Sequence, residues 1–376
     1  MPARTSQDLA DLARLARDGD LDLSQVALRV TTDLLVGAPQ PSREDLEAFG
    51  EMAGALIPTV DDETALVLAR KLAGWHHAPP AVLAALALRG GAVLVELLRH
   101  GMPLSPAALE ELAETGDSAI RTVLAMRPDL TGTAALLLVA LDDRALDLTL
   151  IGNRQVPLPH AAVEALTARA RHDAVYQHGL LARSDLSNLE LAPLFLQAGW
   201  ERRLAILESL LAREVLHPGE RRPAVSREVF ANWLELAGED RDDAFAAIAD
   251  HLGGGPELAL AMAGDASRDL AALALIACGL GVEEATRFLI RLGDETAHSV
   301  ERIFALVDLM RMLRPSVAYR LALSIAGVQP AAPQRKGQHQ PAMDPSGTPA
   351  RPGLARPEAQ PGMSDVLGRI TRRDRG

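Results

Sequence analysis

Residues that could do metal chemistry are few in this sequence and widely spaced. His76 and His77 form the only adjacent histidine pair, in the turn WHHAPP, and two imidazoles supply half of a tetrahedral metal site. His172 and His178 are six residues apart, off the four-residue spacing that places two ligands on one helix face. We therefore expect no bound metal and no cofactor.

Cys278 and the segment HLGGGPEL are the remaining features typical of catalytic proteins, and neither belongs to a complete motif. The cysteine has apolar neighbours in LALIACGLG, which favours a buried small side chain over a nucleophile. The glycines lack the spacing and the lysine of a phosphate-binding loop, and no G-x-S-x-G motif occurs. We predict no catalytic residue. The alternative is an enzyme or small-ligand sensor whose charged residues converge between the two helical blocks described below.

A leucine followed by a helix-starting residue recurs through the middle of the chain. It occurs at residues 104–105, 130–131, 158–159 and 186–187, so the steps are 26, 28 and 28 residues. A fixed period of this size indicates stacked structural repeats.

Each unit of this period has the signals of two short helices. Ser105, Thr131 and Ser187 can accept hydrogen bonds from the free N–H groups of a first helical turn, and Pro159 suits a first turn. A glycine or aspartate break follows in mid-unit, and such short helices bury their apolar faces only by stacking on neighbours. The predicted fold is all-α, a HEAT-like α-solenoid of antiparallel helix pairs followed by a C-terminal helical bundle and a disordered tail.

The sequence divides into five regions. These are irregular helices over 1–74, repeats over 75–212, a Pro/Arg-rich connection over 213–225, an aperiodic helical bundle over 226–327, and a Pro-rich tail over 328–376. The tail has almost no large apolar residue before a short possible docking helix at 364–373, so we expect most of it to be disordered.

Composition and charge exclude several classes of protein. The chain is 48% hydrophobic but only 3% aromatic, which favours close-packed helices over sheets. One cysteine excludes an internal disulfide, and no stretch is long and apolar enough to span a membrane, so we expect a cytoplasmic protein. Residues 328–376 carry a net charge of +4, which leaves −16 for residues 1–327 of a chain whose total is −12. An acidic body is a poor candidate for binding nucleic acid.

Three sets of residues are candidates for partner binding. One is an edge ladder of polar residues at successive repeat ends, Arg99, Arg127, Asn153 and Arg183. These residues either read a ligand or cap helix C-termini, where cations and donors satisfy the last carbonyls, and capping is favoured. The second is the tail helix, with Val366, Leu367 and Ile370 on one face and Arg369, Arg372 and Arg373 around them.

The third set lies in the segment ERIFALVDLMRMLRP. Its apolar residues, including Phe304, Met310 and Met312, surround most of the helix, which predicts burial nearly all round inside the bundle. The alternative is an interface with a partner or a second copy of the chain, in which the methionines adapt to the opposing surface.

Two long runs resemble a known family. The runs are APPAVLAALALRGGAVLVELLRHGMPLSPAALEELAETGDSAIRTVLAMRPDLT and DAFAAIADHLGGGPELALAMAGDASRDLAALALIACGLGVEEATRFLI. They resemble the bacterial, mainly alphaproteobacterial, family called domain of unknown function 2336, over roughly residues 24–326. The resemblance implies HEAT-like helical repeats and supplies no catalytic residues. We expect a non-catalytic scaffold that binds another protein in a bacterial regulatory or localisation pathway.

Overall fold

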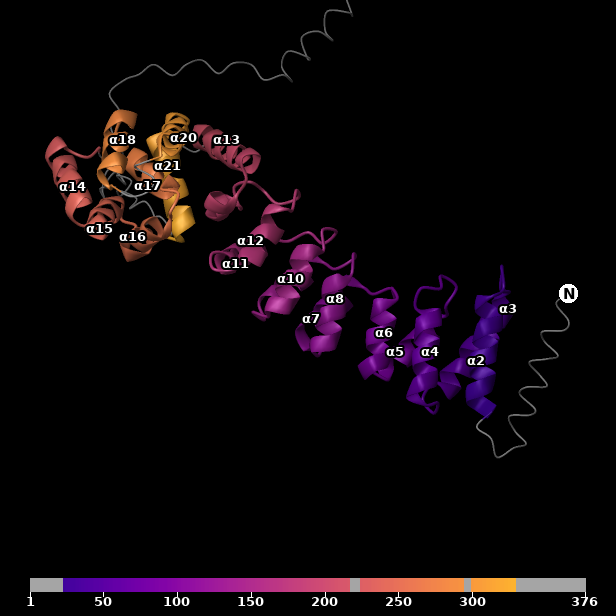
Figure 1. Cartoon of the computed structure of the whole chain (residues 1–376). Coiled ribbons are helices and arrows are strands. Elements are labelled where there is room, and N and C mark those ends of the chain that lie inside the picture. The colour runs from indigo at the N-terminus through magenta and orange to yellow at the C-terminus, as the bar shows by residue number, and fades with distance from the viewer. Residues whose placement is uncertain (1–22, 217–223, 294–298, 329–376) are drawn as a thin grey trace, which may run out of the picture. The chain divides into compact units, whose positions relative to one another are not determined.

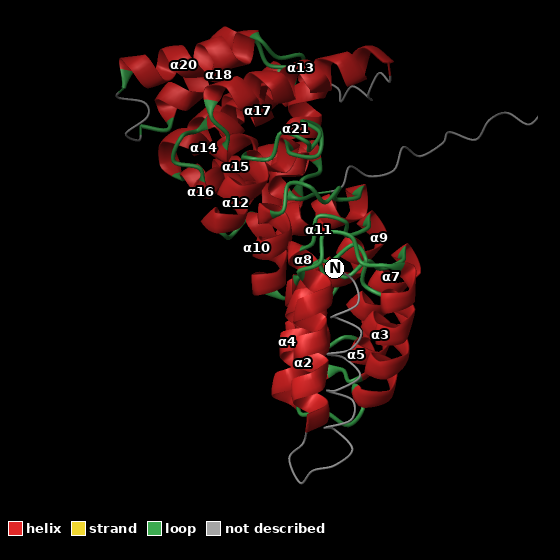
Figure 2. Ribbon diagram, turned by 90° about the vertical axis from the view of Figure 1, so that its right-hand side faces the viewer, coloured by secondary structure: helices red, strands yellow, loops and turns green. Residues whose placement is uncertain are grey.

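The structure is a computed structural model that describes residues 23–216, 224–293 and 299–328. Within these residues every regular element is a helix (Figure 2), which confirms the predicted all-α fold. The N-terminal helices are α2 (Leu23–Val36), α3 (Arg43–Leu56), α4 (Asp62–Leu72), α5 (Pro80–Leu88) and α6 (Gly91–Arg99). Next come α7 (Pro106–Thr115), α8 (Ser118–Met126), α9 (Gly132–Val139), α10 (Arg144–Gly152), α11 (His160–Ala170), α12 (Ala174–Leu181), the 3-10 helix η1 (Ala192–Gln197) and α13 (Trp200–Leu216). The last are α14 (Arg227–Glu239), α15 (Arg241–Leu252), α16 (Gly255–Gly264), α17 (Asp269–Ala277), α18 (Val282–Arg291), α20 (Val300–Arg311) and α21 (Pro315–Ala326).

The predicted helix starts are present in the first units. The Ser105 hydroxyl accepts from the Ala108 N–H at 3.2 Å, and the Thr131 hydroxyl accepts from the Ala134 N–H at 3.1 Å. Pro159 occupies the N-cap position of α11. An aspartate begins the second helix of three successive units, because its carboxylate accepts from the free N–H groups of the first turn.

The repeat helices form two rows. The even row, α2, α4, α6, α8, α10 and α12, packs each helix on the next, and the odd row contains α3, α5, α7, α9, α11 and η1. Figure 2 shows the two rows side by side, and Figure 1 shows the order in which the pairs follow one another. This two-row stacking is the HEAT-like arrangement that the period predicted.

The fourth unit departs from the predicted helix pair. Its first half forms only η1, in which Leu194 has a non-helical backbone (φ −98°, ψ 17°). The Ser187 hydroxyl accepts from the Leu189 N–H two residues on, at 3.3 Å, and not from the N–H three residues on as in the first units. The second half is long, since α13 has 17 residues and continues to Leu216, past the predicted repeat boundary at 212.

The C-terminal helices surround one buried helix. All nine residues of α17 are buried, and α17 packs against α15, α16, α18, α20 and α21. Its sequence, DLAALALIA, is small or aliphatic on every side after the aspartate, as a fully enclosed helix requires. The described residues belong to one compact unit, and a single apolar cluster continues from Leu98 in α6 to Ile325 in α21.

The prediction that the Phe304 helix is buried nearly all round is wrong. Met310 is 1% exposed and belongs to the core, whereas Phe304 is 64% exposed and Val300 is 69% exposed. Met312 is half-buried against the same core. The helix α20 is thus amphipathic, with aliphatic residues on its inner face and an aromatic residue among charges on its outer face.

None of the helices that the structure describes has the length and apolar character to cross a membrane. The predicted docking helix at 364–373 lies outside the described residues, together with the remainder of the tail from 329.

Candidate functional site

The structure places most of the edge ladder inside the protein. Arg127 is 6% exposed and donates to the carbonyls of Leu98 and Met102, both at 2.9 Å. Asn153 donates through its side-chain amide to the carbonyls of Ala125 and Arg127, also at 2.9 Å. Each side chain therefore closes the C-terminal end of the even-row helix in the preceding unit, where the last carbonyls lack partners within their helix.

Arg183 repeats this contact one unit later. It is fully buried, and it donates to the carbonyls of Leu150 at 3.0 Å, Asn153 at 3.2 Å and Val156 at 2.7 Å. The donors of Arg127, Asn153 and Arg183 are directed at backbone oxygen, so these groups act in helix capping. We call these contacts the capping series.

Arg127 and Arg183 are each held by an aspartate two residues later. Asp129 accepts from Arg127 Nε at 2.8 Å and Nη2 at 2.7 Å, and Asp185 accepts from Arg183 Nε at 3.1 Å and Nη2 at 2.7 Å. These hydrogen bonds hold the pKa of both carboxyl groups below the usual range of aspartate, against the opposing effect of burial. The spacing Arg-x-Asp at two unit ends is a sequence signal that could have identified the series.

The capping series continues through an arginine that the sequence did not indicate. Arg202, in α13, donates to the carbonyls of Leu181 and Arg183 at the end of α12, and to Asn188 Oδ1 at 3.0 Å. Every even-row helix from α6 to α12 is thus closed by a side chain from the unit that follows it.

Arg99, the first residue of the ladder, has a different environment. It is exposed and donates to Glu96 Oε2 at 3.0 Å, while Arg70 and His100 also contact the same carboxylate. Glu96 is only 6% exposed. The hydrogen bond from Arg70 is the main reason that the pKa of Glu96 is below its usual value. Arg70 belongs to α4 and Glu96 belongs to α6, so this cluster joins the two helices.

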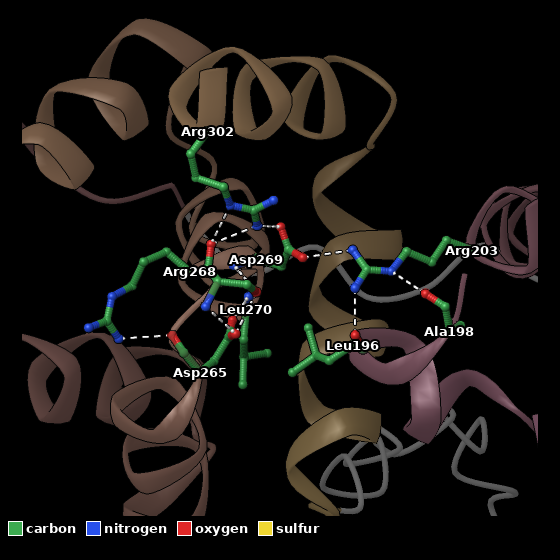
Figure 3. Close-up of polar contacts among 9 residues, drawn as sticks. Leu196, Ala198, Arg203, Asp265, Arg268, Asp269, Leu270 and Arg302 are labelled. Atoms are coloured by element: carbon green, nitrogen blue, oxygen red, sulfur yellow. Dashed lines mark hydrogen bonds and ion pairs between the residues drawn. The ribbon is translucent and has the colours of Figure 1, made fainter. Parts of the chain in front are cut away.

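A buried ionic cluster lies between the repeats and the C-terminal helices. Asp269 is 3% exposed, and its two carboxylate oxygens accept from two arginines that are distant in sequence. Arg203 of α13 donates to Oδ2 at 2.7 Å, and Arg302 of α20 donates to Oδ1. Figure 3 shows Asp269 between the two guanidinium groups. We call these three residues the Asp269 junction.

The surrounding backbone completes the Asp269 junction. Arg203 also donates to the carbonyls of Leu196 and Ala198, and Arg302 donates to the Ser267 carbonyl at 2.9 Å and 2.6 Å (Figure 3). The cluster therefore ties the end of the repeats to α17 and α20, through a buried carboxylate paired with two partly exposed guanidinium groups. It occupies the region where an enzyme or sensor would have its site.

A second contact between the two blocks involves Arg171 and Gly327. Gly327 ends α21 with a left-handed backbone (φ 77°), and a Cβ at this position would overlap the Arg171 guanidinium. Burial lowers the pKa of Arg171 from its usual value. The absence of a side chain at Gly327 thus permits close packing of the α11–α12 turn against the end of α21.

A shallow hollow marks the irregular fourth unit. Its volume is about 350 Å³, and its lining comes from α12 and the η1–α13 turn. The lining residues are Ala174, Gln177, His178, Leu181, Ala182, Gln197 and Gly199. Val175 and Trp200, which follow two of the lining residues in sequence, are 54% and 58% exposed. We call this region the α12 groove.

The chemistry of the α12 groove is neutral. No Asp, Glu, Lys or Arg lines it, and its polar groups are two glutamine amides and one imidazole. The Gln177 amide nitrogen donates to the Ala170 carbonyl at 2.7 Å, which fixes that side chain. Amide groups beside apolar surface match the peptide backbone and aliphatic side chains of another protein.

The other candidates for chemistry stand apart. The His76 and His77 rings are tilted, with their centroids 3.8 Å apart, and Cys278 is buried at the end of α17. Among the described residues, no three His, Cys, Asp or Glu side chains gather as a metal site. The partner-binding candidates of the tail lie outside the described residues, as do their contacts. They are Val366, Leu367, Arg369, Ile370, Arg372 and Arg373.

The chain matches a bacterial protein family. A family model described as "Uncharacterised protein conserved in bacteria (DUF2336)" matches residues 93–305. The matched range begins in α6 and ends in α20, so it contains the capping series, the Asp269 junction and the α12 groove. No curated protein and no solved structure matches the chain.

Proposed function

This chain belongs to the bacterial family called domain of unknown function 2336, and we propose that it is a non-catalytic helical-repeat scaffold that binds another protein. The proposed setting is a regulatory or localisation pathway in the bacterial cytoplasm. The proposal rests chiefly on the α12 groove, a hollow at the point where the repeat pattern is interrupted, and on the exposed apolar residues that adjoin its lining in sequence.

The distribution of charge supports a binding role over a catalytic one. The buried arginines Arg127, Arg183 and Arg202 donate to helix carbonyls, and Asp269 is held by two guanidinium groups. These side chains stabilise the stacking of the units, because each satisfies groups of a neighbouring unit. An enzyme or sensor site at the Asp269 junction would have to displace these contacts, so we place that function second.

The partner that fits the α12 groove is a peptide segment with a large aliphatic or aromatic side chain. Trp200 and Val175, which follow the lining residues Gly199 and Ala174 in sequence, offer exposed apolar surface, and tryptophan is enriched among the residues that dominate protein interfaces. Gln177 and Gln197 supply neutral hydrogen-bonding groups for the backbone of such a segment.

Site-specific crosslinking tests the proposal. A photoreactive residue in place of Gln197, in the full chain expressed in its own cell, should crosslink to one protein, identified by mass spectrometry. Val175→Asp should reduce that crosslink at least tenfold, because a charge would be buried in the interface. Leu260→Asp is the matched control, since Leu260 is 73% exposed on α16, and it should leave the crosslink unchanged. A crosslink that survives Val175→Asp would contradict binding at this groove.

A further inference from the structure

The α12 groove lies where the even row of helices stops. From α4 to α12, each even-row helix packs on the one before it. The next long helix, α13, meets the C-terminal end of α12, where Arg202 donates to the carbonyls of Leu181 and Arg183. It then packs mainly against η1 and α21, and does not extend along α12 as α12 extends along α10. The outer side of α12 therefore has no even-row helix packed along it within the part of the chain that the structure describes.

The lining of the groove is the side of α12 that points away from α10. On the α10 side, the Tyr176 hydroxyl donates to Asp147 Oδ2 at 2.7 Å. Gly179 packs closely on the same helix, since a Cβ there would lie 2.5 Å from Ile151 Cγ2. The residues two positions from Tyr176 or Gly179 lie about 200° around the helix, and all of them line the groove: Ala174, Gln177, His178 and Leu181.

The lining occupies the helix positions by which α10 holds α12. Both helices begin at an aspartate, Asp143 in α10 and Asp173 in α12, which gives them a common register. The first, fourth and eighth residues after that aspartate are Arg144, Asp147 and Ile151 in α10, and Ala174, Gln177 and Leu181 in α12. Arg144 donates to Asp173 Oδ2 at 2.8 Å, so the N-terminal ends of the two helices lie together and the helices run parallel. The other two α10 residues make the contacts with Tyr176 and Gly179. The groove thus repeats the surface on which one more even-row helix would stack.

The charges of this surface differ between α10 and α12. Arg144 and Asp147 of α10 are replaced at the equivalent positions of α12 by Ala174 and Gln177. A helix that stacks on α12 therefore has no ion pair to form at these positions, and it gains apolar contact with Leu181. Its contacting face should be uncharged, because a charge brought into this contact would lose water without gaining a partner.

The packing of α12 on α10 indicates which side chains such a helix would present. α12 presents Tyr176 to α10 and, three residues later, Gly179, whose missing side chain lets the two backbones approach closely. The equivalent positions of the groove are Gln177 and Leu181. A fitting helix has a large apolar or aromatic residue near Gln177, and glycine or alanine about one turn later near Leu181.

Taking the proposed function as given, we propose that the α12 groove binds one helix of another protein as the next member of the even row. This helix lies parallel to α12, and its uncharged face carries a large apolar residue followed three positions later by a small one. The stacking interface already repeated along the even row is thereby continued by the partner. The backbone groups that Gln177 and Gln197 can bond are then those that a helix leaves open at its ends.

Crosslinking from the two ends of the groove tests the helix. A photoreactive residue replaces Ala174 or, separately, Ala182, in the full chain expressed in its own cell. Both are exposed lining residues, and they are eight positions apart in sequence, or about 12 Å along α12. The two partner residues that are crosslinked, located by mass spectrometry, should be about eight positions apart, with the one reached from Ala182 nearer the partner's C-terminus. An extended segment would cover the same distance in about four residues.

The outcomes separate this proposal from the proposed function. A spacing of about four residues, or the reverse order, would overturn the parallel helix and leave the binding of another protein standing. The absence of any crosslink, or a crosslink to a second copy of this chain, would overturn both.

A charge in the groove tests the stacking contact. Ala174→Lys should reduce the crosslink from a photoreactive residue at Ala182 at least tenfold, because it places a charge in a neutral contact. Ala107→Lys, at an exposed alanine in the first turn of α7, is the matched control and should leave the crosslink unchanged. An undiminished crosslink in Ala174→Lys would overturn the stacked helix.

Discussion

Replacing Asp269 by asparagine should weaken the link between the repeats and the C-terminal helices. The substitution keeps the size of the side chain but removes its charge. One amide oxygen can accept from one arginine, and the amide N–H₂ must then face the donors of the other. Arg203 and Arg302 are only 20% and 29% exposed, so neither can be fully hydrated in compensation.

The expected cost is about 3 kcal/mol. Removing one partner of a buried ion pair costs roughly 3–5 kcal/mol, because a charge remains buried without its counterion. The lower end applies here because Arg203 keeps the carbonyls of Leu196 and Ala198, and Arg302 keeps that of Ser267.

Hydrogen exchange measured by mass spectrometry locates the effect. Amides of α17 exchange through opening of the C-terminal helices, so a loss of about 3 kcal/mol should speed their exchange roughly a hundredfold. Amides of α3, which lies remote from the Asp269 junction in the repeat order, should be unaffected. Glu47→Gln is the control, since its ion pair with Arg43 is exposed and is worth at most about 0.5 kcal/mol.

Two results would refute this reasoning. One is a change of less than threefold in the exchange of α17, which would mean that Asp269 contributes little to stability. The other is an equal change in α3 and α17, which would mean that the substitution destabilises the whole chain without regard to the junction.

The remaining predictions concern the capping series and two glycines. Arg183→Met should lower the free energy of unfolding by about 3 kcal/mol in urea titrations, because several buried carbonyls lose their donor, whereas Arg154→Met at an exposed site should change it by less than about 0.5 kcal/mol. Gly327→Ala should destabilise by at least about 1 kcal/mol, from left-handed strain and overlap with the adjacent guanidinium, while Gly152→Ala, with open space at its Cβ, should be neutral or stabilising in thermal unfolding. Asp185→Asn should show a pH-dependent cost: the carboxyl pKa is lower in the folded protein, so its stabilisation is complete above the unfolded pKa of about 3.9 and is lost as pH falls through the folded value. The difference between wild type and Asp185→Asn should thus be larger at pH 7 than at pH 3, and an equal difference at both would contradict the ionic contact.

Local features of this fold could be predicted from sequence because their partners are close in the chain. Ser105 and Thr131 cap helices through N–H groups three residues away, and the repeat period needs only a count of residues. The Arg-x-Asp pairs at 127/129 and 183/185 are equally local, because each aspartate accepts from an arginine two residues away.

The Asp269 junction and the orientation of α20 depend on contacts between segments that are distant in the sequence. Asp269 meets Arg203 and Arg302 across 66 and 33 residues, and no local pattern marks these three residues as partners. The apolar residues of α20 did not show which side would face the core, because both sides have large side chains. The ion pair between Arg302 and Asp269 fixes that orientation and leaves Phe304 outside.

The capping series has a direction, and this matters while the chain is being synthesised. Each even-row helix from α6 to α12 receives its final donor from a residue that lies in the next unit. During synthesis the N-terminal units emerge first. The C-terminal carbonyls of the newest even-row helix therefore lack their side-chain donor until about one further unit has emerged. The final closure is made by Arg202 in α13, the second half of the fourth unit, so the chain has to reach α13 before the last open end is removed.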